Sequence, residues 1–151
     1  MANIIYNHGL AQLLKTSGAF ESVNYVAALE RSTSTYAPNK DHADLATILT
    51  GGFVEISVPS YARKNLASKT VTVDLVNDKA VIDCGDIDFG TLESGQTVKA
   101  VLIYRDGGTN NDRIPLLYID TDAGGLLPRA LADGNFTVRI AAEGLIDFTQ
   151  V

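Results

Sequence analysis

The residues of this chain best placed to do chemistry are carboxylates beside glycines. The segment Asp106-Gly-Gly-Thr-Asn-Asn-Asp112 lies between two apolar stretches, residues 101–104 and 114–119. Such a segment can hold a calcium ion, bind a phosphate or turn the chain. A phosphate-binding glycine loop opens a helix whose amides receive the anion, whereas here Ile114-Pro115 starts a second strand pattern. We therefore interpret the segment as a β-hairpin loop, made mobile by its glycines and asparagines and suited to contact a partner.

Calcium is the second chemistry that the carboxylates suggest. Five aspartates offer hard oxygen ligands at alternating spacing: Asp83, Asp86, Asp88, Asp120 and Asp122. A calcium-binding EF-hand loop that began at Asp120 would need a glutamate at position 131, where this chain has Leu131. Aspartate beside glycine in a β protein usually marks a turn, because its side chain bonds the backbone two residues on. We expect turns here, with no tight calcium site, no metal and no cofactor.

The side chains that serve most often in catalysis are few. We expect His8 to lie on the surface or between helix and sheet, and His42, flanked by Asp41 and Asp44, to face solvent. Cys84 occupies an inward strand position and is expected to be a buried, inert core residue. No serine lies in a Gly-x-Ser-x-Gly motif. We expect no catalytic residue, although a carboxylate-pair hydrolase stays open because acids that folding brings together leave no sequence signature.

One helix is expected to begin the chain, over about residues 3–17. Asn3 is the predicted N-cap, and Gly18 is the predicted stop. The apolar residues at helical spacing are Tyr6, Leu10, Leu13 and Leu14. A single amphipathic helix of this length must bury its stripe on another element.

That element is predicted to be a sheet. Residues 23–29 alternate as a half-buried strand, and residues 70–84 read as a hairpin that turns at Asn77-Asp78 and points Val71, Val73 and Leu75 to one side. Further strands are expected at residues 98–104, 114–119, 136–141 and 145–148. Residues 44–49 form either a short helix ended by Gly51-Gly52 or part of a long loop, with a strand at 53–58. The pattern predicts a single domain, residues 1–151, that is mainly β: an antiparallel sandwich or barrel, jelly-roll-like, with one N-terminal helix.

Composition narrows the function classes. Eighteen acidic and twelve basic residues give a net charge of −6, and the densest basic spot is Arg63-Lys64. Nucleic-acid binders need a basic stripe to displace counterions from phosphates, so no nucleic-acid partner is expected. The apolar runs are too short to span a membrane, and the first ten residues do not resemble a secretory signal. The single cysteine favours folding in a reducing cytosol.

Several segments resemble a family of small virion proteins of tailed bacteriophages. They are "MANIIYNHGLAQLL", "VAAL", "KTVTVDLVNDKAVID", "VKAVLIYRDGG", "LLYIDT" and "FTVRIAAEGLIDF". The resemblance implies a non-enzymatic structural protein of the phage particle, of the kind found as head decoration, or cement, proteins. It implies a location on the outer surface of the capsid after synthesis in the bacterial cytoplasm, binding to the major capsid protein, and self-association as a homotrimer.

Exposed loops are the expected contacts with that partner. The candidate residues are Asp106, Gly107, Gly108, Thr109, Asn110, Asn111, Asp112, Tyr36, Asn39 and Asp41. Two alternatives stay open. One is a tail or fibre module that binds host glycans with exposed Tyr36 and Tyr61, and the other is the carboxylate-pair hydrolase acting on polysaccharide.

Overall fold

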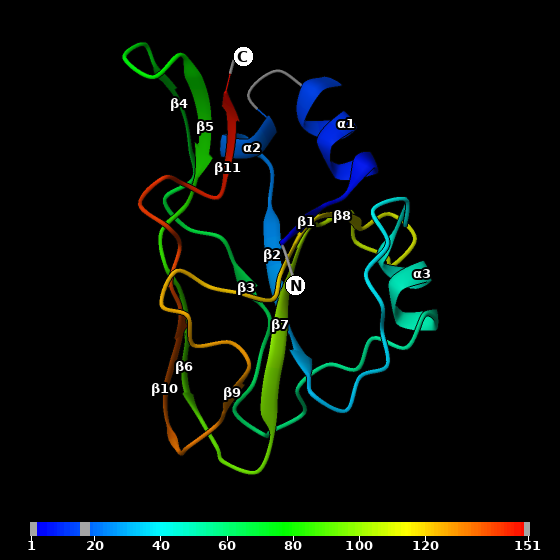
Figure 1. Ribbon diagram of the computed structural model, residues 1–151. Coiled ribbons are helices and arrows are strands. Elements are labelled where there is room, and N and C mark those ends of the chain that lie inside the picture. The colour runs from blue at the N-terminus through cyan, green and yellow to red at the C-terminus, as the bar shows by residue number, and fades with distance from the viewer. Residues whose placement is uncertain (1–2, 16–18, 150–151) are drawn as a thin grey trace.

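A computed structural model describes residues 3–15 and 19–149 as a mainly antiparallel β fold (Figure 1). The helices are α1 (Asn7–Lys15), α2 (Ala19–Ser22) and α3 (Leu45–Thr50). The strands are β1 (Ile4–Ile5), β2 (Tyr25–Arg31), β3 (Lys64–Asn65), β4 (Thr70–Asp74), β5 (Lys79–Asp83), β6 (Ile87–Leu92), β7 (Thr97–Arg105), β8 (Ile114–Ile119), β9 (Arg129–Ala130), β10 (Gly134–Val138) and β11 (Ile146–Thr149). This confirms the predicted fold class.

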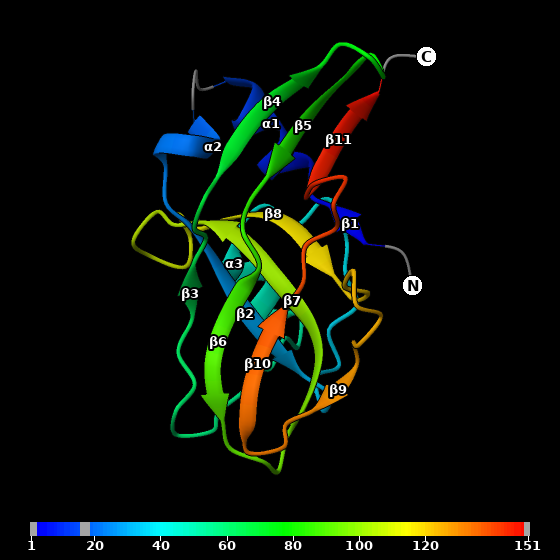
Figure 2. The ribbon, with the colours of Figure 1, turned by 90° about the vertical axis from the view of Figure 1, so that its left-hand side faces the viewer.

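The strands form three antiparallel sheets. The main sheet has the order β1-β8-β7-β2-β3, with β9 paired to β7, and the smaller sheets are β10-β6 and β11-β5-β4. No closed barrel forms among the residues that the structure describes. The main sheet lies between the β6–β10 pair on one side and α3 with its flanking loop on the other (Figures 1 and 2). The β4–β5 hairpin and β11 extend from the end of the molecule that also bears α1 and α2.

Two hydrophobic clusters fill the two faces of the main sheet. On β2, Ala27 and Leu29 belong to the cluster under β6 and β10, and Val26 and Ala28 belong to the cluster under α3. The strand predicted at residues 23–29 forms as β2, but the prediction that it is half-buried is wrong, because every residue of β2 except Arg31 is buried. Side chains from the loop around α3 cover the face that we expected to meet solvent.

The beginning of the chain also differs from the prediction. Ile4–Ile5 form β1, which pairs with the edge of β8, and the helix begins only at Asn7. Asn3 is not an N-cap. Its side-chain oxygen accepts from the backbone amides of Asp120 and Thr121 at 3.1 and 3.3 Å. An unpaired strand edge offers the chain hydrogen bonds that a longer helix cannot reach. The predicted stop at Gly18 lies outside the described residues.

Helix α1 packs its backbone closely on β8. A Cβ atom added to Gly9 would lie 2.3 Å from the carbonyl oxygen of Pro115. The apolar stripe by which α1 packs on the sheet is narrower than predicted, since Leu10 and Leu13 are half-buried and Leu14 is exposed. None of the described helices is long and apolar enough to cross a membrane.

The predicted hairpins at residues 70–84 and 98–119 both form. Asp74 pairs with Lys79, so the first hairpin turns through the four residues 75–78 rather than through Asn77-Asp78 alone. Residues 44–49 follow the helical alternative, with Asp44 as the N-cap of α3, and residues 53–58 form only a single bridge, Glu30 to Glu55. Strand β6 was not predicted, because its alternating Ile87 and Phe89 sit among aspartates and glycines that suggest turns.

Candidate functional site

The two loops predicted to contact a partner lie side by side. Residues 106–113 connect β7 to β8, and the register Arg105 to Ile114 confirms the hairpin. The backbone amides of Leu45 and Ala46 donate to the carbonyl oxygens of Arg113 and Asn110 at 2.9 and 3.1 Å. The start of α3 is thus tied to the hairpin loop. We call residues 39–47 and 106–113 together the polar loop surface.

Side chains of the loop hold it in one conformation. Asp106 accepts from the amide of Gly108 at 3.2 Å and from Nε of Arg113 at 2.9 Å. The Arg113 bond is the main cause that lowers the pKa of Asp106. A Cβ atom added to Gly107 would lie 2.2 Å from the carbonyl oxygen of Asp112, so the loop closes tightly at this point. These bonds favour an ordered loop, where composition predicted a mobile one.

Tyr36 was predicted to contact a partner, but the structure buries it. Only 2% of it is exposed, and its ring packs edge-on against Phe53 and Tyr118. Its hydroxyl is 2.8 Å from the hydroxyl of Tyr6 and 2.9 Å from Nδ1 of His42. The prediction that His42 faces solvent is wrong for the same reason, since its ring is half-buried beside Tyr36.

The other predicted contact residues lie where a partner can reach them. Asn39 and Asp41 are exposed. Asn39 accepts from the amide of Asp41 at 3.0 Å, and Asp41 accepts from the side-chain amide of Asn7 at 2.6 Å. In the hairpin loop, residues 107–109, 111 and 112 are exposed, and Asp106 and Asn110 are half-buried.

A buried carboxylate on β2 is the most unusual polar group of the fold, and the sequence analysis missed it. Glu30 is fully buried. Its oxygens accept from the hydroxyls of Ser34 and Tyr118, and Nζ of Lys99 lies 3.5 Å away. Burial is the largest cause that raises the pKa of the Tyr118 hydroxyl, and its hydrogen bond to Glu30 is the next largest. Through Ser34, Glu30 connects the main sheet to the loop before α3. Because Glu30 has no access to solvent, it cannot meet a substrate. The feature of the sequence that could have revealed this group is a glutamate that directly follows an apolar strand pattern.

Three of the aspartates considered as calcium ligands accept hydrogen bonds from backbone amides. Asp86 accepts from the amide of Ile140 at 2.8 Å, Asp88 from Gly90 at 2.9 Å, and Asp122 from Leu126 at 2.7 Å. These are the bonds expected of turns and loop junctions. Within residues 3–15 and 19–149, no group of three or more His, Cys, Asp or Glu side chains is placed to hold a metal ion.

Cys84 is buried, as predicted, although it lies just past the end of β5. Burial, followed by the charges of Asp83 and Asp86, raises the pKa of its thiol to about 12. A thiol with so high a pKa carries almost no thiolate, the nucleophilic form, near neutral pH.

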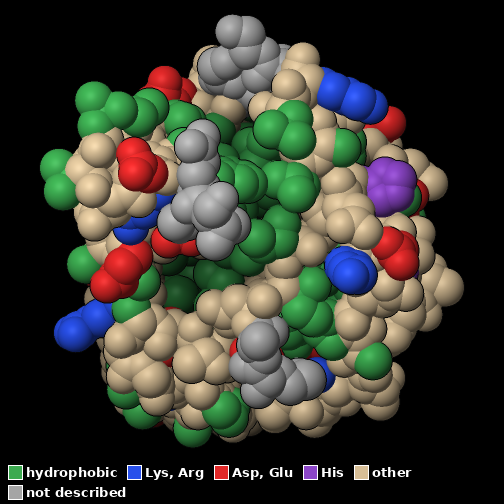
Figure 3. Space-filling view, turned by 45° about the horizontal axis from the view of Figure 1, so that its top comes forward, with side chains coloured by type: hydrophobic (Ala, Val, Ile, Leu, Met, Phe, Trp, Pro, Cys, Tyr) green, Lys and Arg blue, Asp and Glu red, His purple; other side chains and the backbone are tan. Residues whose placement is uncertain are grey.

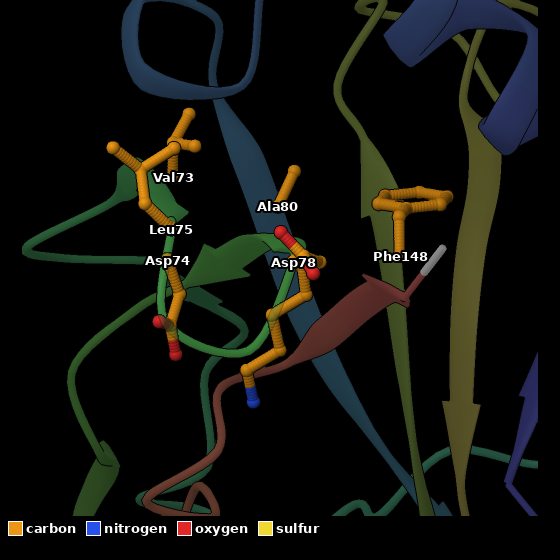
Figure 4. A pocket seen from close by; sticks show the side chains of 7 residues that line it. Val73, Asp74, Leu75, Asp78, Ala80 and Phe148 are labelled. Carbon is orange, nitrogen blue, oxygen red and sulfur yellow. The ribbon is translucent and has the colours of Figure 1, made fainter. Parts of the chain in front are cut away.

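The second surface is apolar. The β11-β5-β4 sheet has one apolar face, made of cross-strand rows. Val71, Ile82 and Ile146 form the inner row, and Val73, Ala80 and Phe148 form the next. Ile82 and Ile146 belong to the core, but exposure rises outward, to 72% at Val73 and to 83% and 91% at Leu75 and Val76 in the turn. We call the outer apolar residues, Val73, Leu75, Val76, Ala80 and Phe148, the apolar arm (Figure 4).

The opposite face of this sheet is polar, with Thr70, Thr72 and Asp74 on β4. The predicted alternation is therefore confirmed along β4, but the apolar side of this sheet is buried only near the body, at Ile82 and Ile146. Fully burying a Val, Leu or Phe side chain contributes about 1.5–3 kcal/mol to folding stability. The most exposed side chains of the arm, Val73, Leu75 and Val76, obtain little of this stabilisation. Contiguous exposed apolar surface on a folded chain marks a contact site.

The arm borders a wider apolar region. Figure 3 looks onto the end of the molecule that bears α1, the hairpin and β11, and shows hydrophobic side chains gathered in a hollow there. A pocket is lined by four apolar residues, Val73, Leu75, Ala80 and Phe148, and by three charged residues, Asp74, Asp78 and Lys79. Figure 4 shows Ala80 between Val73 and Phe148, so the middle of this row is a notch.

No protein-family model, curated protein or solved structure matches the chain. Two surfaces of the fold, the polar loop surface and the apolar arm, are the features that bear on its function, beside the resemblance of the quoted segments.

The aromatic candidates for glycan binding have roles inside the fold. Tyr36 is buried, and the hydroxyl of Tyr61 donates to Glu55 at 2.5 Å and accepts from the amide of Leu29 at 2.9 Å. The ring of Tyr61 stacks on Phe89 at a centroid distance of 6.1 Å. Tyr36 therefore offers no exposed ring face to a sugar, and the half-buried Tyr61 has one ring face against Phe89.

Proposed function

We propose that this chain is a non-enzymatic structural protein of a tailed-phage particle, most simply a decoration protein that binds the major capsid protein and stabilises the shell from outside. The observation that carries the proposal is that one small chain presents two separate contact surfaces. The polar loop surface lies beside α3, and the apolar arm lies at the end of the molecule formed by the β4–β5 hairpin and β11 (Figure 1).

Two surfaces are what a bridging protein needs. A protein that only binds one ligand can work with one surface, whereas a protein that reinforces a lattice must connect at least two bodies. Weak contacts suffice for this, because linked contacts act at high effective concentration once the first has formed. Individual exposed ion pairs are worth only about 0–1 kcal/mol, so the polar loop surface suits a contact that is repeated many times on a shell.

The polar groups of the fold support a structural role. Among the described residues, no buried side-chain nitrogen or oxygen lacks a hydrogen-bond partner. The buried Glu30 is used by Ser34, Tyr118 and Lys99, and the half-buried Glu55 is paired with Arg63 at 2.8 Å. The net charge of −6 suits the outside of a shell better than a surface that faces packaged DNA.

The polar loop surface can be tested by adding bulk to it. Thr47 and Asn111 are exposed and line the same shallow depression beside α3. We expect a Thr47→Arg, Asn111→Arg variant to lose capsid binding by about tenfold or more, because long side chains there separate the surfaces. The measurement is cosedimentation of purified protein with empty capsids built from the capsid protein of the same phage.

A matched control exists on the other side of the molecule. Thr91 and Asn135 are exposed neighbours on the β6–β10 pair. Thr91→Arg with Asn135→Arg makes the same chemical change and is expected to leave binding intact. Immunogold labelling of particles provides the second readout. Wild-type protein that does not sediment with capsids, or that labels tails rather than heads, would overturn the proposal.

A further inference from the structure

We infer that the polar loop surface responds to pH: protonation of His42 separates its ring from Tyr36 and rearranges residues 39–44, so that a partner is bound less tightly there in mild acid. Histidine is the side chain that ordinarily changes its charge between about pH 5 and 8. The inference names a regulation of the contact and rests on the proposed function for what is bound. The rearrangement itself can be measured without a capsid.

Three side chains form a hydrogen-bonded row that ends at His42. The Tyr36 hydroxyl lies 2.8 Å from the hydroxyl of Tyr6 and 2.9 Å from Nδ1 of His42. Tyr6 is fully buried, and within residues 3–15 and 19–149 its hydroxyl has no other hydrogen-bond partner. Burial is the largest cause that raises the pKa of both hydroxyls, so both tyrosines keep their protons near neutral pH.

The row has one arrangement in which each hydroxyl hydrogen has an acceptor. A tyrosine hydroxyl carries a single hydrogen. Tyr6 donates to Tyr36, because a buried donor without an acceptor costs free energy. Tyr36 then has its own hydrogen for Nδ1 of His42. A ring nitrogen accepts only when it carries no proton, so His42 is neutral in this arrangement and holds its proton on Nε2.

Protonation of His42 makes this arrangement impossible. The charged imidazole carries a hydrogen on both ring nitrogens, so Nδ1 and the Tyr36 hydroxyl would each point a hydrogen at the other. Reversing both bonds of the row leaves the hydrogen of Tyr6 without an acceptor inside the core. Both alternatives favour a His42 ring that has moved away from Tyr36.

On its solvent side, a charged His42 meets an acid. Asp44 lines the same shallow depression as His42, together with Asn111 of the hairpin loop, and no lysine or arginine of the described residues lines it. The charges of Asp106 and Arg113 in that loop are paired with each other at 2.9 Å. An opposite charge nearby favours the charged form of a ring, so Asp44 favours the outward position.

On the inner side, the charges are already paired. Glu30 is paired with Lys99 at 3.5 Å. Nζ of Lys99 also donates to the backbone carbonyl oxygen of Tyr36 at 3.2 Å, so one positive charge already lies beside this residue. A second positive charge on the His42 ring is disfavoured there, because like charges repel.

A movement of His42 changes the surface that a partner meets. Its segment is joined to the start of α1, because the amide of Asn7 donates to the carbonyl oxygen of Lys40 at 2.8 Å and the Asn7 side chain donates to Asp41 at 2.6 Å. The exposed Lys40 and Asp41 therefore hold their places through the same short segment that carries the ring. Separation of the ring from Tyr36 removes one of the contacts that fix this segment.

The first test is the protonation state of His42, which nitrogen-15 NMR of the imidazole ring measures. We expect a neutral ring with its proton on Nε2 at pH 8 and a charged ring at pH 5. Amide hydrogen exchange in residues 39–44, corrected for the intrinsic effect of pH, should be at least about tenfold faster at pH 5. Exchange in β7 should not change.

Two matched variants separate His42 from other titrating groups. His42→Asn keeps a neutral acceptor close to the position of Nδ1, so exchange in residues 39–44 should stay slow at both pH values. His8→Asn removes the other histidine, which is exposed, and should respond to acid as the wild type does. The NMR measurement on wild-type protein needs neither variant and stands if one of them misfolds.

The second test is cosedimentation with empty capsids at pH 8 and pH 5. Wild type and His8→Asn should bind about tenfold or more weakly at pH 5, whereas His42→Asn should bind equally well at both pH values. Because all three proteins meet the same capsids, an effect of pH on the capsid itself would appear in all three.

Several outcomes overturn the inference. They are a His42 ring with its proton on Nδ1 at pH 8, a ring still neutral at pH 5, exchange in residues 39–44 that is the same at both pH values, and a His42→Asn protein that loses binding in acid as the wild type does. Wild-type protein that ignores capsids at pH 8 contradicts the proposed function instead, and the NMR and exchange measurements still decide the inference.

Discussion

Glu30 shows at the scale of one residue how a charge is kept inside a sheet. It is fully buried, and it is held by hydrogen bonds from Ser34 and Tyr118 and by Lys99 at 3.5 Å. We expect Glu30→Ala to lower the free energy of unfolding by about 3 kcal/mol, because the hydroxyl of Tyr118 loses its acceptor inside the fold and Lys99 loses its ion-pair partner. Urea unfolding followed by circular dichroism measures this.

The control for Glu30 is an exposed glutamate. Glu143 is exposed in the loop before β11, and Glu143→Ala should change the free energy of unfolding by no more than about 0.5 kcal/mol. A Glu30→Ala protein that is as stable as Glu143→Ala would show that the buried network contributes nothing to stability.

Cys84 is expected to be unreactive in the folded protein. Its pKa rises from the usual 9.0 to about 12, which leaves roughly a thousandfold less thiolate at neutral pH. A thiol reagent at pH 8 should label it at least about a hundredfold more slowly in native protein than in urea-unfolded protein. Rapid native labelling, followed by mass spectrometry, is the contrary result.

At the scale of elements, the contact between α1 and β8 depends on Gly9. Replacing glycine by alanine inside a helix normally stabilises by about 1 kcal/mol. Here the added Cβ would lie 2.3 Å from the Pro115 carbonyl oxygen. Overpacking costs about 1–3 kcal/mol, so we expect Gly9→Ala to destabilise the protein, measured as a lower urea midpoint. A Gly9→Ala protein as stable as the wild type would place the helix farther from the sheet than described.

The hairpin loop gives a prediction with a pH dependence. Hydrogen bonds from Arg113 and the Gly108 amide lower the pKa of Asp106. A carboxyl group whose folded-state pKa lies below its unfolded value of about 3.9 stabilises the fold above that pH, and this contribution disappears as the pH falls through the folded-state pKa. Asp106→Asn should therefore be less stable than wild type at pH 7, and the two should converge below about pH 4.

The partner residue supplies the control for this loop. In a protein that carries Arg113→Met, the further change Asp106→Asn should have a smaller effect at pH 7, because the largest cause of the lowered pKa is already absent. Urea midpoints over a pH series measure both differences. A stability gap between wild type and Asp106→Asn that persists at pH 2 would contradict the proposed cause.

At the scale of the whole molecule, the salt dependence of binding distinguishes a contact through the apolar arm from a contact through the polar loop surface. With a net charge of −6, copies repel one another at low ionic strength, and salt screens this repulsion within about 10 Å at 0.1 M. Sulfate salts also strengthen apolar burial. Any contact made through the apolar arm should therefore tighten as ammonium sulfate is added, which sedimentation velocity measures. Association that weakens with salt would indicate a contact made mainly by charged groups, away from the arm.

The sequence by itself determined what neighbouring residues decide. Alternation of apolar side chains and turn-forming residues predicted both hairpins, since a strand's faces and a turn's backbone angles are local properties. An inward position in a strand pattern predicted the burial of Cys84. Asp44 and Gly51 bound α3 as the helical alternative required, but the sequence left a long loop equally open. The polar hairpin loop was recognisable because Asp106 and Asp112 flank glycines and asparagines.

Tertiary structure alone decided which of these surfaces are covered. The edge of β8 turned Ile4–Ile5 into a strand, and the loop around α3 buried the second face of β2 and the ring of Tyr36. Hydrogen bonds from Leu45 and Ala46 joined two loops about sixty residues apart into one surface. The same alternation that sends Ile82 into the core sends Val73 into solvent, because only the inner row of the β11-β5-β4 sheet lies over the body. Burial depends on what packs against a face, and residues distant in sequence supply that.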